Sequence, residues 1–483
     1  MTVKFNLKID FMYYKYKMIG LRIAFLVIIV AGFSSCRTYK NLVDAPAVDT
    51  QGIIRDTLDN KTDTATIADT PWKEYFTDPK LQALIGEGLE KNVDLQVALS
   101  RIKQTEAALS IARGAFLPSV SLAGKVDHTR KSSGNSGTDV LGYTSNVNYL
   151  GFSASWEIDL WGKLSNQSKA KYASLLSSYE YRNLVQTTLI ANIAKAYYSL
   201  IALDEQLRIT KETIGLLQKS AETMQALKDA GLQNAAAVEQ SNALLYSTQL
   251  SLLQLDYQVR KQENALCILL GRKPNSIDRV SIDSQSVAGK LNYGVPAQLL
   301  ARRPDVKQAE LSFCSAYALT NVAKANFYPS LTISSASIGY AAGEFSDFFK
   351  PEHIAAEIIA GLTQPLFLKK QLRGNLKIAQ AQQEEALLNF QNTVLLAGQE
   401  VSDILYGYKT SLSKNDFRDK QIASLTNAVD YTQELLKAGE ANYTEVLSAQ
   451  QNLLSAQLSR VSDKLEQLTY SVNLYKALGG GIK

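Results

Sequence analysis

The hydrophobic positions of the chain follow two different periods in different stretches. Between residues 163 and 228, apolar side chains recur at alternating intervals of four and three, which predicts a long helix with one face in a coiled coil. These positions are Leu189, Ile193, Ala196, Leu200, Leu203, Leu207, Thr210, Ile214, Leu217, Ala221 and Met224. The last helical stretch has the same spacing at Leu458, Val461, Leu465, Leu468, Val472 and Tyr475. A soluble bundle is the alternative, but about 66 residues at 1.5 Å each extend roughly 100 Å, which favours a long coiled coil.

Other stretches alternate between apolar and small or acidic residues, as half-buried strands do. The apolar positions are Leu150, Phe152, Ala154, Trp156, Ile158 and Leu160 in residues 148–160, and Ile354, Ala356, Ile358, Ala360 and Leu362 in residues 354–366. This alternation is typical of membrane barrel strands, with a soluble sheet as the alternative. Within residues 330–340 the apolar phase changes between Ile333 and Ala336, which predicts a bulge near Ser334 and Ser335.

The chain contains one internal repeat. The segment "ARGAFLPSVSL", residues 112–122, passes from a helical pattern through a proline into an alternating one, and "AKANFYPSLTI", residues 323–333, does so again. An offset of 211 aligns this part of the two halves, and an offset of 208 aligns the later part, where Gly231 meets Gly439. Chance similarity between alanine-rich helices would not keep register through two kinds of element. We therefore predict that the two halves fold alike.

Each half is predicted to contain a helix, two strands, a long helix and a closing helix. The first repeat covers residues 71–295, with a helix over about 79–116, strands within about 119–160, helices over 163–228 and 234–270, and an irregular segment over 272–295. The second covers residues 296–483, with a helix over about 297–327, strands within about 330–366, and helices over 371–437 and 442–477. The fold class is therefore α+β. Because four strands cannot close a membrane barrel and an open sheet edge is unstable in lipid, two, three or four copies must share one barrel if the strands span a membrane.

The N-terminus has the pattern of an exported lipoprotein. Residues 1–35 are predicted to be a signal peptide, with a basic beginning and an apolar run over 23–33 that is short for a membrane span. Cys36 follows directly and matches the lipidation site of bacterial lipoproteins, where the thiol takes a diacylglyceride, although Phe33 stands where leucine is usual. An ordinary signal peptide beside a chance cysteine is the alternative. Candidate start residues are Met1, Met12 and Met18. Residues 36–70 are rich in Asp, Thr and Ala, which predicts a flexible linker behind the lipid anchor.

Composition and charge narrow the function classes. With 46% hydrophobic and 20% charged residues, the chain is globular or membrane-associated rather than disordered. Most of the formal net charge of +5 lies in the first 35 residues, so we expect no nucleic-acid surface.

Sequence motifs for chemistry are missing as well. The two histidines, His128 and His353, lie in separate strand-like stretches, so we expect no metal site and no other cofactor. No phosphate loop, nucleophile elbow or zinc-protease motif occurs, so we expect no catalytic residue and no enzyme. Asp127 and His128 are adjacent on a strand and point to opposite faces. Beyond the lipidation site, Cys267 and Cys314 are interpreted as small buried residues in helices.

Eight stretches stand in a fixed order along the chain: "PWKEYFTDPKLQALI", "NVDLQVALSRI", "ARGAFLPSV", "WEIDLWGKL", "LLARRPDVKQAE", "ANFYPSL", "LKAGEANYTEVLSAQQNLLSAQ" and "VNLYKALGGG". Together they resemble the trimeric TolC/OprM-like outer-membrane factors, in particular the lipoprotein branch that serves resistance-nodulation-division (RND) efflux pumps. The resemblance covers nearly all of residues 72–480. The order and spacing of these stretches are specific, although no single one is.

The resemblance implies a passive conduit for small molecules from the periplasm to the exterior. It implies a homotrimer whose transmembrane barrel takes four strands from each chain, above a helical tunnel in the periplasm. An inner-membrane RND pump would supply energy through a periplasmic adaptor. A mixed equatorial belt would draw on residues 71–80, 272–296, part of 408–422 and the C-terminus.

The periplasmic end of the tunnel is expected at the turns farthest from the strands. These are at Gly231 and Gly439, where glycine suits the end of a helix. In the family, acidic side chains shortly after the second turn line the closed aperture. Glu445 occupies one such position, and Ser448 occupies another, where aspartate is frequent. Glu239, near the first turn, is the next candidate.

A purely structural interpretation of these residues is equally open. Asn442 as N-cap and Glu445 at the third helical position resemble a capping box. The function also has alternatives: a conduit for type I protein secretion, or, from a different class, a periplasmic coiled-coil scaffold lipoprotein. The lipidation site and the "RRPDV" segment favour efflux, and the membrane-type strands argue against a scaffold.

Overall fold

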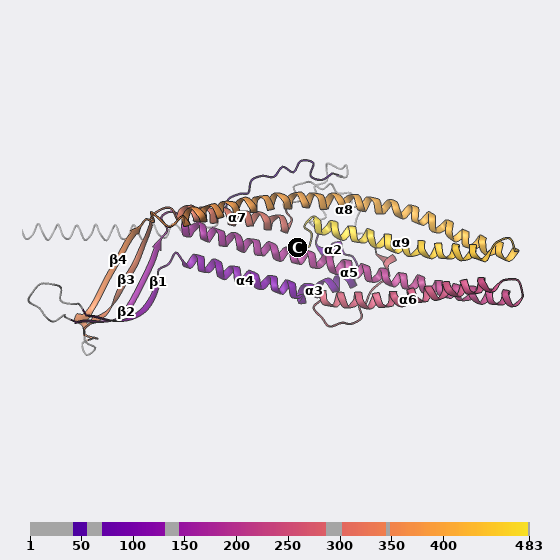
Figure 1. Ribbon diagram of the computed structural model, residues 1–483, viewed down its shortest axis with the longest axis horizontal. Coiled ribbons are helices and arrows are strands. Elements are labelled where there is room, and N and C mark those ends of the chain that lie inside the picture. The colour runs from indigo at the N-terminus through magenta and orange to yellow at the C-terminus, as the bar shows by residue number, and fades with distance from the viewer. Residues whose placement is uncertain (1–41, 56–69, 131–143, 286–301, 344–347, 482–483) are drawn as a thin grey trace, which may run out of the picture. The chain divides into compact units, whose positions relative to one another are not determined.

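The computed structural model describes residues 42–55, 70–130, 144–285, 302–343 and 348–481 (Figure 1). The chain forms two compact units. The first consists of Met1–Pro46, Gln104–Leu176 and Glu310–Leu388, and the second of Ala47–Lys103, Ser177–Ala309 and Asn389–Lys483. The predicted signal peptide, Cys36 and most of the predicted linker lie outside the described residues.

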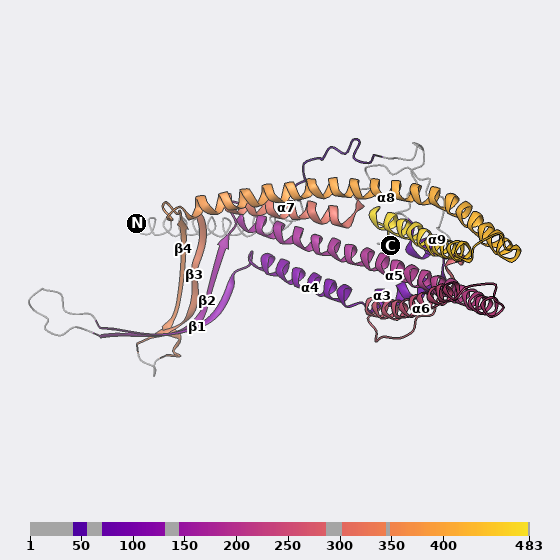
Figure 2. The ribbon, with the colours of Figure 1, turned by 45° about the vertical axis from the view of Figure 1, so that its right-hand side comes forward.

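The first unit contains one antiparallel sheet of four strands (Figure 2). The strands are β1, Ser119–Arg130, β2, Thr144–Ile158, β3, Ser330–Ala342, and β4, Ile354–Thr363, and they pair in the order β1-β2-β3-β4. β1 and β2 come from the first repeat, and β3 and β4 come from the second. The sheet therefore joins one strand pair from each half, and β1 and β4 are its edges.

One face of the sheet is apolar, as the alternation predicted, and the other is mostly small or polar, with Val147 and Ile359 as exposed apolar exceptions. On the apolar face Leu122 lies opposite Phe152, which lies opposite Ile338. On the other face Ser153 lies opposite Ser337. Exposed side chains of the apolar face are Val120, Leu122, Val126, Phe152, Ile338, Ile354, Ile358 and Leu362. The sheet thus presents a continuous apolar surface on one side only.

The predicted bulge in the third strand is confirmed. The pairing of β3 with β4 shifts register between Ile333 and Ser335, and the pairing with β2 shifts between Ala154 and Trp156. Ile333 lies opposite Trp156 and Ala336 lies opposite Ala154. The extra residue of β3 therefore keeps its apolar side chains on one face despite their change of phase.

The helices occupy the remaining regular parts of both repeats. They are α2, Trp72–Tyr75, α3, Pro79–Lys91, α4, Val93–Gly114, α5, Lys163–Asp229, α6, Ala235–Leu269, α7, Pro304–Ala325, α8, Gln371–Ala438, and α9, Tyr443–Ala477, with short 3₁₀ helices η3, Ile282–Ser284, and η6, Pro351–His353. Residues 408–422, assigned by resemblance to the belt, lie within α8 without a break. Among the described helices, none combines the length and apolar content that a bilayer crossing requires.

The coiled-coil seam predicted in the first long helix is buried or half-buried along α5. Leu189, Ile193, Leu200, Leu217 and Met224 are all at most 5% exposed. Between residues 189 and 202 the burial is wider than a single seam. There the helix also buries Ile190, Ala191, Ala194, Tyr197, Tyr198, Ile201 and Ala202. This part of α5 is therefore enclosed on more than one side in the core of the second unit.

The first predicted helix, over 79–116, is two helices in the structure. Asn92 separates them, because its backbone is extended and ends α3. Its side-chain oxygen accepts the Leu95 N–H (3.1 Å), which caps α4, and its amide donates to the Leu269 carbonyl at the end of α6 (2.9 Å). The sequence pattern missed this break because the apolar period continues through it.

The second repeat makes the equivalent contact to a helix end with a different side chain. Arg303, at an offset of 211 from Asn92, donates to the Ala477 carbonyl at the end of α9 (3.1 Å). It also binds Asp305 and Glu400 (2.8 and 2.7 Å) and is 7% exposed. Burial acts to lower the pKa of Arg303, but the two carboxylates outweigh it and the pKa is raised. Arg303 therefore stays charged and ties three segments of the second unit together.

Three segments of the predicted equatorial belt pack together in the second unit. Asp78 accepts hydrogen bonds from the Tyr197 hydroxyl (2.6 Å) and the Gln285 amide (2.8 Å). The Tyr75 ring stacks on Tyr475 with centroids 4.3 Å apart, and burial raises the pKa of Tyr75 to about 12. These aromatic and polar contacts join residues 70–80, 277–285 and the C-terminal segment.

Part of the predicted flexible linker packs against the folded body. In the first unit, Val43 packs in a cluster with Phe313 and Cys314, whose thiol donates to the Val43 carbonyl (3.1 Å). In the second unit, Ile54 is 7% exposed and the Arg55 N–H donates to Ser402 Oγ (3.0 Å). The structure thus differs from the expectation for residues 42–55, because their few apolar side chains find complementary helix surfaces.

Isolated histidines and cysteines have ordinary structural roles. His128 lies in β1, as expected, but His353 ends the short helix η6 rather than lying in a strand. Cys267 and Cys314 are free and buried in helices α6 and α7, as predicted. Burial raises the pKa of Cys314 to about 11, so its thiol stays protonated.

Candidate functional site

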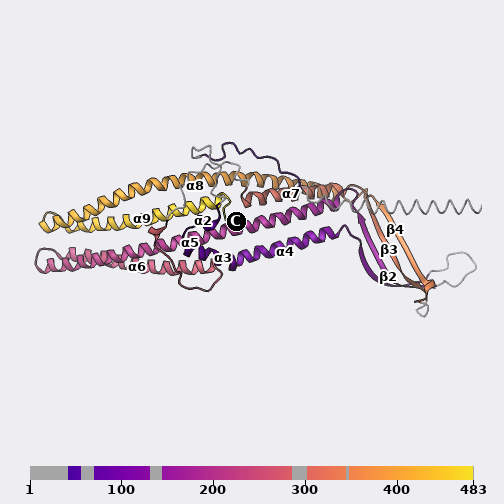
Figure 3. The same ribbon diagram turned by 180° about the vertical axis from the view of Figure 1, so that it is seen from behind.

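The tips of two helical hairpins in the second unit form the candidate site (Figure 3). The first hairpin joins α5 to α6. Gly231, at φ +75°, donates to the Lys228 carbonyl (2.9 Å), and Leu232 donates to the Leu227 carbonyl (2.9 Å). This pair of bonds is a Schellman motif, and its glycine takes the left-handed conformation that a side chain would strain. Asn234 then caps α6 by accepting the Ala237 N–H (3.0 Å).

The second hairpin, from α8 to α9, turns in the same way. Gly439, also at φ +75°, donates to Leu436 (3.1 Å), and Glu440 donates to Leu435 (2.9 Å). Asn442 caps α9 by accepting the Thr444 N–H (3.1 Å). The expected turns, the glycine helix ends and the restart of helix at position 442 are therefore all observed.

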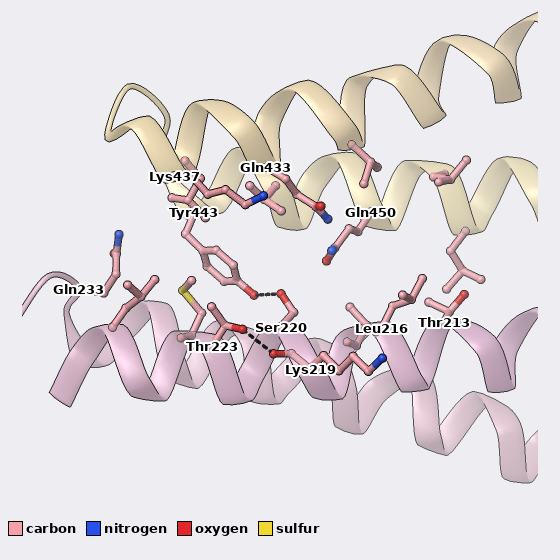
Figure 4. A pocket seen from close by; sticks show the side chains of 18 of the residues that line it. Thr213, Leu216, Lys219, Ser220, Thr223, Gln233, Gln433, Lys437, Tyr443 and Gln450 are labelled. Carbon is pink, nitrogen blue, oxygen red and sulfur yellow. Dashed lines mark hydrogen bonds between the residues drawn. The ribbon is translucent and has the colours of Figure 1, made fainter. Parts of the chain in front are cut away.

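A buried tyrosine joins the two tips. Tyr443, at the start of α9, is 1% exposed (Figure 4). Its hydroxyl donates to Ser241 of α6 (2.9 Å) and shares a second hydrogen bond with Ser220 of α5 (2.9 Å). Around it, buried residues of both hairpins form one apolar cluster: Met224, Ala237, Val238, Tyr443, Val446 and Leu447. The two hairpins are thus held together just behind their turns.

A groove of about 820 Å³ runs between the two hairpins. Its walls are mainly apolar, with Leu216 of α5 63% exposed and Leu232 of the first turn 70% exposed. Figure 4 shows the amide side chains of Gln433 and Gln450 directed into it. Gln450 Oε1 is buried and has no hydrogen-bond partner within the described parts of the chain. Such an acceptor lacks a donor that a docked partner can supply.

Two cations stand at the edge of this groove. Lys219 of α5 and Lys437 of α8 both line it, and Lys437 pairs with Glu434 (2.8 Å). The groove therefore combines apolar walls, an amide oxygen without a described hydrogen-bond donor and positively charged side chains. That combination suits the packing of a helical partner better than a reaction on a small molecule.

The predicted gate residues lie outside the groove. Glu445 and Ser448 of α9 and Glu239 of α6 are all exposed, and none lines the cavity. Within the described residues their side chains make no hydrogen bond or ion pair with one another or with other groups. Asn442 does cap α9, and its carbonyl accepts the Glu445 N–H (3.0 Å), but the carboxylate does not complete a capping box. Within the described residues the Glu445 carboxylate therefore has no capping partner.

The sequence analysis missed Tyr443, Gln450 and the groove. A tyrosine directly after an N-cap asparagine, at a position where the other repeat has Ala235, is the signal that could have pointed to Tyr443. The groove depends on two hairpins 200 residues apart, which no local pattern reports.

The tips hold no grouping suited to catalysis. In the described residues no three His, Cys, Asp or Glu side chains come together as a metal site would require. The site's chemistry is packing, capping and surface charge at the end of paired helices.

Long paired helices and a four-stranded sheet with one apolar face define the class of outer-membrane channels with a TolC-like fold. The chain belongs to the outer membrane efflux protein family, whose profile matches residues 84–272 and 295–480. The two matched stretches also correspond to the two halves of the repeat. The chain is therefore the outer-membrane channel of an efflux system, not an enzyme.

Named relatives agree with this assignment. The chain is 30% identical over 432 residues to the toluene efflux pump outer membrane protein TtgC of Pseudomonas putida, covering 86% of each chain. It is 28% identical over 415 residues to the probable outer membrane lipoprotein SilC of Salmonella typhimurium, covering 86% of this chain and 88% of that one.

Solved channel structures have the same fold. A crystal structure of CusC superimposes with a TM-score of 0.80 at 25% identity, covering 91% of this chain and 98% of CusC. The open state of the Neisseria gonorrhoeae MtrE outer membrane channel gives a TM-score of 0.81 at 25% identity, covering 92% and 98%. The predicted fold class and outer-membrane location are thus confirmed.

Proposed function

We propose that three copies of this chain form one channel, with a barrel of four strands from each copy above a tunnel of paired helices. The observation that carries this proposal is the four-stranded sheet with an apolar face and two open edges, β1 and β4. In lipid, unpaired backbone groups at an edge are strongly unfavourable, so β1 of one copy would pair with β4 of the next. A trimer closes the sheet with the strand number of a medium-sized barrel.

The native mass of the detergent-solubilised protein tests the assembly. Three chains per particle are expected. A particle of one well-folded chain would contradict the shared barrel, because its edges would then have to be satisfied in some other way. A substitution of Val120 or Ile358 by aspartate, on the apolar face, should reduce insertion without changing the helical content measured by circular dichroism.

At the hairpin tips, we propose that Glu445 from three copies forms an acidic ring at the entrance of the channel. Its carboxylate is exposed and makes no ion pair with the described residues. Like charges brought together in a narrow ring repel, so the closed state would need cations or nearby donors. Bound cations would also obstruct flow. Ser448 adds a neutral position one helical turn later, and Glu239 of α6 is the alternative ring residue.

Single-channel recording in planar bilayers tests the ring. Glu445→Gln should change the conductance and weaken block by divalent cations while the trimer stays assembled. Glu222→Gln is the matched control, because Glu222 is also exposed, lies on α5 near the neighbouring hairpin tip and makes no ion pair with the described residues. Unchanged conductance and block in Glu445→Gln would assign the ring to other residues, with Glu239→Gln as the next variant.

We infer that the groove between the hairpins receives a periplasmic adaptor, which connects the channel to an inner-membrane RND pump. The exposed leucines and the unpartnered Gln450 amide support a helical partner. Photo-crosslinking from position 216 or 232 in living cells should capture an adaptor, whereas position 111 on α4, also exposed, should not. Crosslinking only to other copies of this chain would contradict the docking.

Lipidation of Cys36 is a further part of the proposal. SilC, a relative, is named as a probable outer membrane lipoprotein. Mass spectrometry of the mature N-terminus should find a diacylglyceride at Cys36, and Cys36→Ser should remove it. An unmodified mature N-terminus would contradict lipidation and leave the channel assignment intact.

The cargo is proposed to be small molecules. Relatives are named for the efflux of toluene and of cations, which are both small. Deletion of the gene should raise the sensitivity of the cells to at least one small toxic compound, and the secretion of proteins should not change. Loss of a secreted protein instead would favour type I secretion.

A further inference from the structure

The turn from β4 into α8 has an unusual backbone. Lys369 and Lys370 have φ values of +43° and +68°, and among the described residues they are the non-glycine residues with positive φ. In the first repeat the corresponding turn precedes α5, and there Gly162, at φ +72°, occupies the place of Lys370. Both residues directly precede their long helix, so the two turns are equivalent. The second turn therefore places strained lysines where the first uses a glycine.

The helix start in the second repeat also lacks its cap. Four residues before α5, Asp159 accepts the N–H groups of Leu164 and Ser165 (3.1 and 2.9 Å). Four residues before α8 stands Phe367, which is 83% exposed. The two lysines lie beside the positive end of the α8 dipole, where cations are unfavourable. Helix capping, backbone preference and charge all make Phe367, Lys369 and Lys370 unfavourable at this helix start. This indicates that these residues are selected for something other than stability.

The surroundings of the turn combine apolar and aromatic side chains with the charged residues Glu157, Asp159 and Lys163. Leu366 and Leu368 are 92% and 44% exposed, on either side of Phe367. Leu368 lines a hollow of about 240 Å³ together with Trp161 and Tyr328. These two rings stack with centroids 5.0 Å apart and are each about half exposed. The apolar face of β4 continues directly into this segment, because Leu362, one residue before the strand's end, is 66% exposed on that face.

We propose that residues 366–370 form a binding site for anionic phospholipid at the membrane surface where α8 begins. Leu366, Phe367 and Leu368 enter the acyl region, and the ammonium groups of Lys369 and Lys370 bind the headgroup phosphate. Both lysines are exposed and have no ion pair within the described chain. Aromatic rings with flanking lysines are typical of residues at a membrane interface, and the inference rests on the outer-membrane location.

A lipid is favoured over a protein partner by continuity and by charge. The segment extends the apolar face of the sheet, and that face needs a hydrocarbon environment. Within the described residues neither lysine pairs with a carboxylate, because Glu157 pairs with Lys163 and Asp159 accepts two N–H groups at the start of α5. Phosphate diesters, in contrast, lie at the depth where an apolar segment ends. The strained backbone holds both ammonium groups on one short turn. A glycine in place of either lysine would make the turn more flexible and remove one of these groups.

The test uses the full-length protein purified in detergent and stripped of lipid. Native mass spectrometry follows the binding of phosphatidylglycerol, with phosphatidylcholine as the neutral lipid. Lys369→Gln with Lys370→Gln should lower the affinity for phosphatidylglycerol roughly thirtyfold, the size expected for the loss of two basic residues at an anionic surface. Phosphatidylcholine binding should not change. Lys211→Gln with Lys228→Gln, an exposed pair on α5, is the control and should bind both lipids as the wild type does.

A charge-keeping variant protects the test against misfolding. Lys369→Arg with Lys370→Arg should retain phosphatidylglycerol binding. Inorganic phosphate should compete poorly, because the apolar contacts require acyl chains. Equal phosphatidylglycerol affinity in the wild type and the glutamine pair would overturn the proposal. So would loss of the trimer in the glutamine pair, which would assign the turn to a neighbouring copy. Channel conductance, measured on the same proteins, separates this outcome from a failure of the channel itself.

Discussion

At the two hairpin tips the repeats use the same residues for the same task. Gly231 and Gly439 end the long helices at identical φ, and Asn234 and Asn442 start the next ones. At the two turns from strand to long helix they do not. The first turn has the Asp159 cap and Gly162, and at the same distances from its helix the second has the exposed Phe367 and Lys370.

The difference follows from what each pair of turns contacts. The two tips contribute to one buried cluster, so both hairpins must end at matching heights and angles. The two strand-to-helix turns share a hollow lined by Trp161 and Leu368, but both side chains are exposed there, so local capping can give way to another demand. The contacts at the ends of α6 and α9 are intermediate between these two cases. There Asn92 and Arg303 bind equivalent helix ends, but with different side chains. This internal repeat therefore keeps its chemistry where both halves contribute to one buried cluster and changes it where they meet at exposed side chains.

The largest expected effect is at the tips. Tyr443→Ala should lower the local stability of the hairpins by about 3 to 5 kcal/mol, because it empties a fully buried site. Tyr443→Phe should cost about 1 to 2 kcal/mol, because it removes the bonds to Ser220 and Ser241. Hydrogen exchange of peptides covering 214–245 and 431–450 measures both. Tyr246→Ala, at a 59% exposed position of α6, is the control. Equal exchange in all three variants would contradict a joining role for Tyr443.

The second-largest effect is expected at Arg303. Arg303→Asn gives the second repeat the residue of the first and should destabilise the second unit by about 3 kcal/mol, because Asp305 and Glu400 lose a buried partner. The control is Lys377→Asn on the exposed face of α8, which should change stability by less than about 0.5 kcal/mol. Thermal unfolding in detergent compares them. A loss no greater than the control's would mean that asparagine suffices at both positions.

Glycine substitutions compare the turns directly. Gly231→Ala, Gly439→Ala and Gly162→Ala should each cost about 1 to 2 kcal/mol, because each glycine has a left-handed φ. At Gly231 and Gly439 a Cβ would meet no atom within 4 Å, so the loss there is backbone strain alone. Gly215→Ala, within α5 and also in open space, should instead stabilise the helix slightly. Hydrogen exchange near each turn provides the comparison. A loss at Gly215 as large as at Gly231 would contradict the role of φ.

The smallest effects have the opposite sign. Lys370→Gly should stabilise the start of α8 by up to about 1 kcal/mol, because glycine relieves the strain. Phe367→Asp restores the cap of the first repeat and should add about 1 kcal/mol. Exchange of the amides at 371–375 measures the gain. Both variants should weaken phosphatidylglycerol binding at the same time. Destabilisation by either change would show that the turn is already optimal for the fold.

Much of the fold was predictable because its signals are local and repeated. The seam in α5, the alternation in the strands and the bulge near Ser334 all come from side-chain period, which burial imposes directly on sequence. The break at Asn92 was missed because the apolar pattern runs through it, and capping by one side chain leaves a weak trace. The packing of residues 42–55 was missed because only a few apolar residues carry it.

The candidate site was predictable in position but not in content. Gly231 and Gly439 marked the tips because a left-handed helix end requires glycine. The groove was not predictable, since its walls come from segments about 200 residues apart. The roles of Glu445, Ser448, Glu239 and Cys36 remain predictions, because they depend on neighbouring copies or on residues outside the described chain.

The sequence by itself determined the class of this protein: its periods and its duplication predicted the elements of the fold, and the order and spacing of its matching stretches gave the resemblance to outer-membrane factors. Only the tertiary structure decided which repeated positions still do the same work. Period and turn chemistry act between near neighbours, so the sequence records them. The position of Tyr443 between two serines depends on distant segments. The left-handed lysines depend on the backbone conformation of their turn. The sequence does not encode these in any local pattern, because the same residues are ordinary elsewhere in the chain.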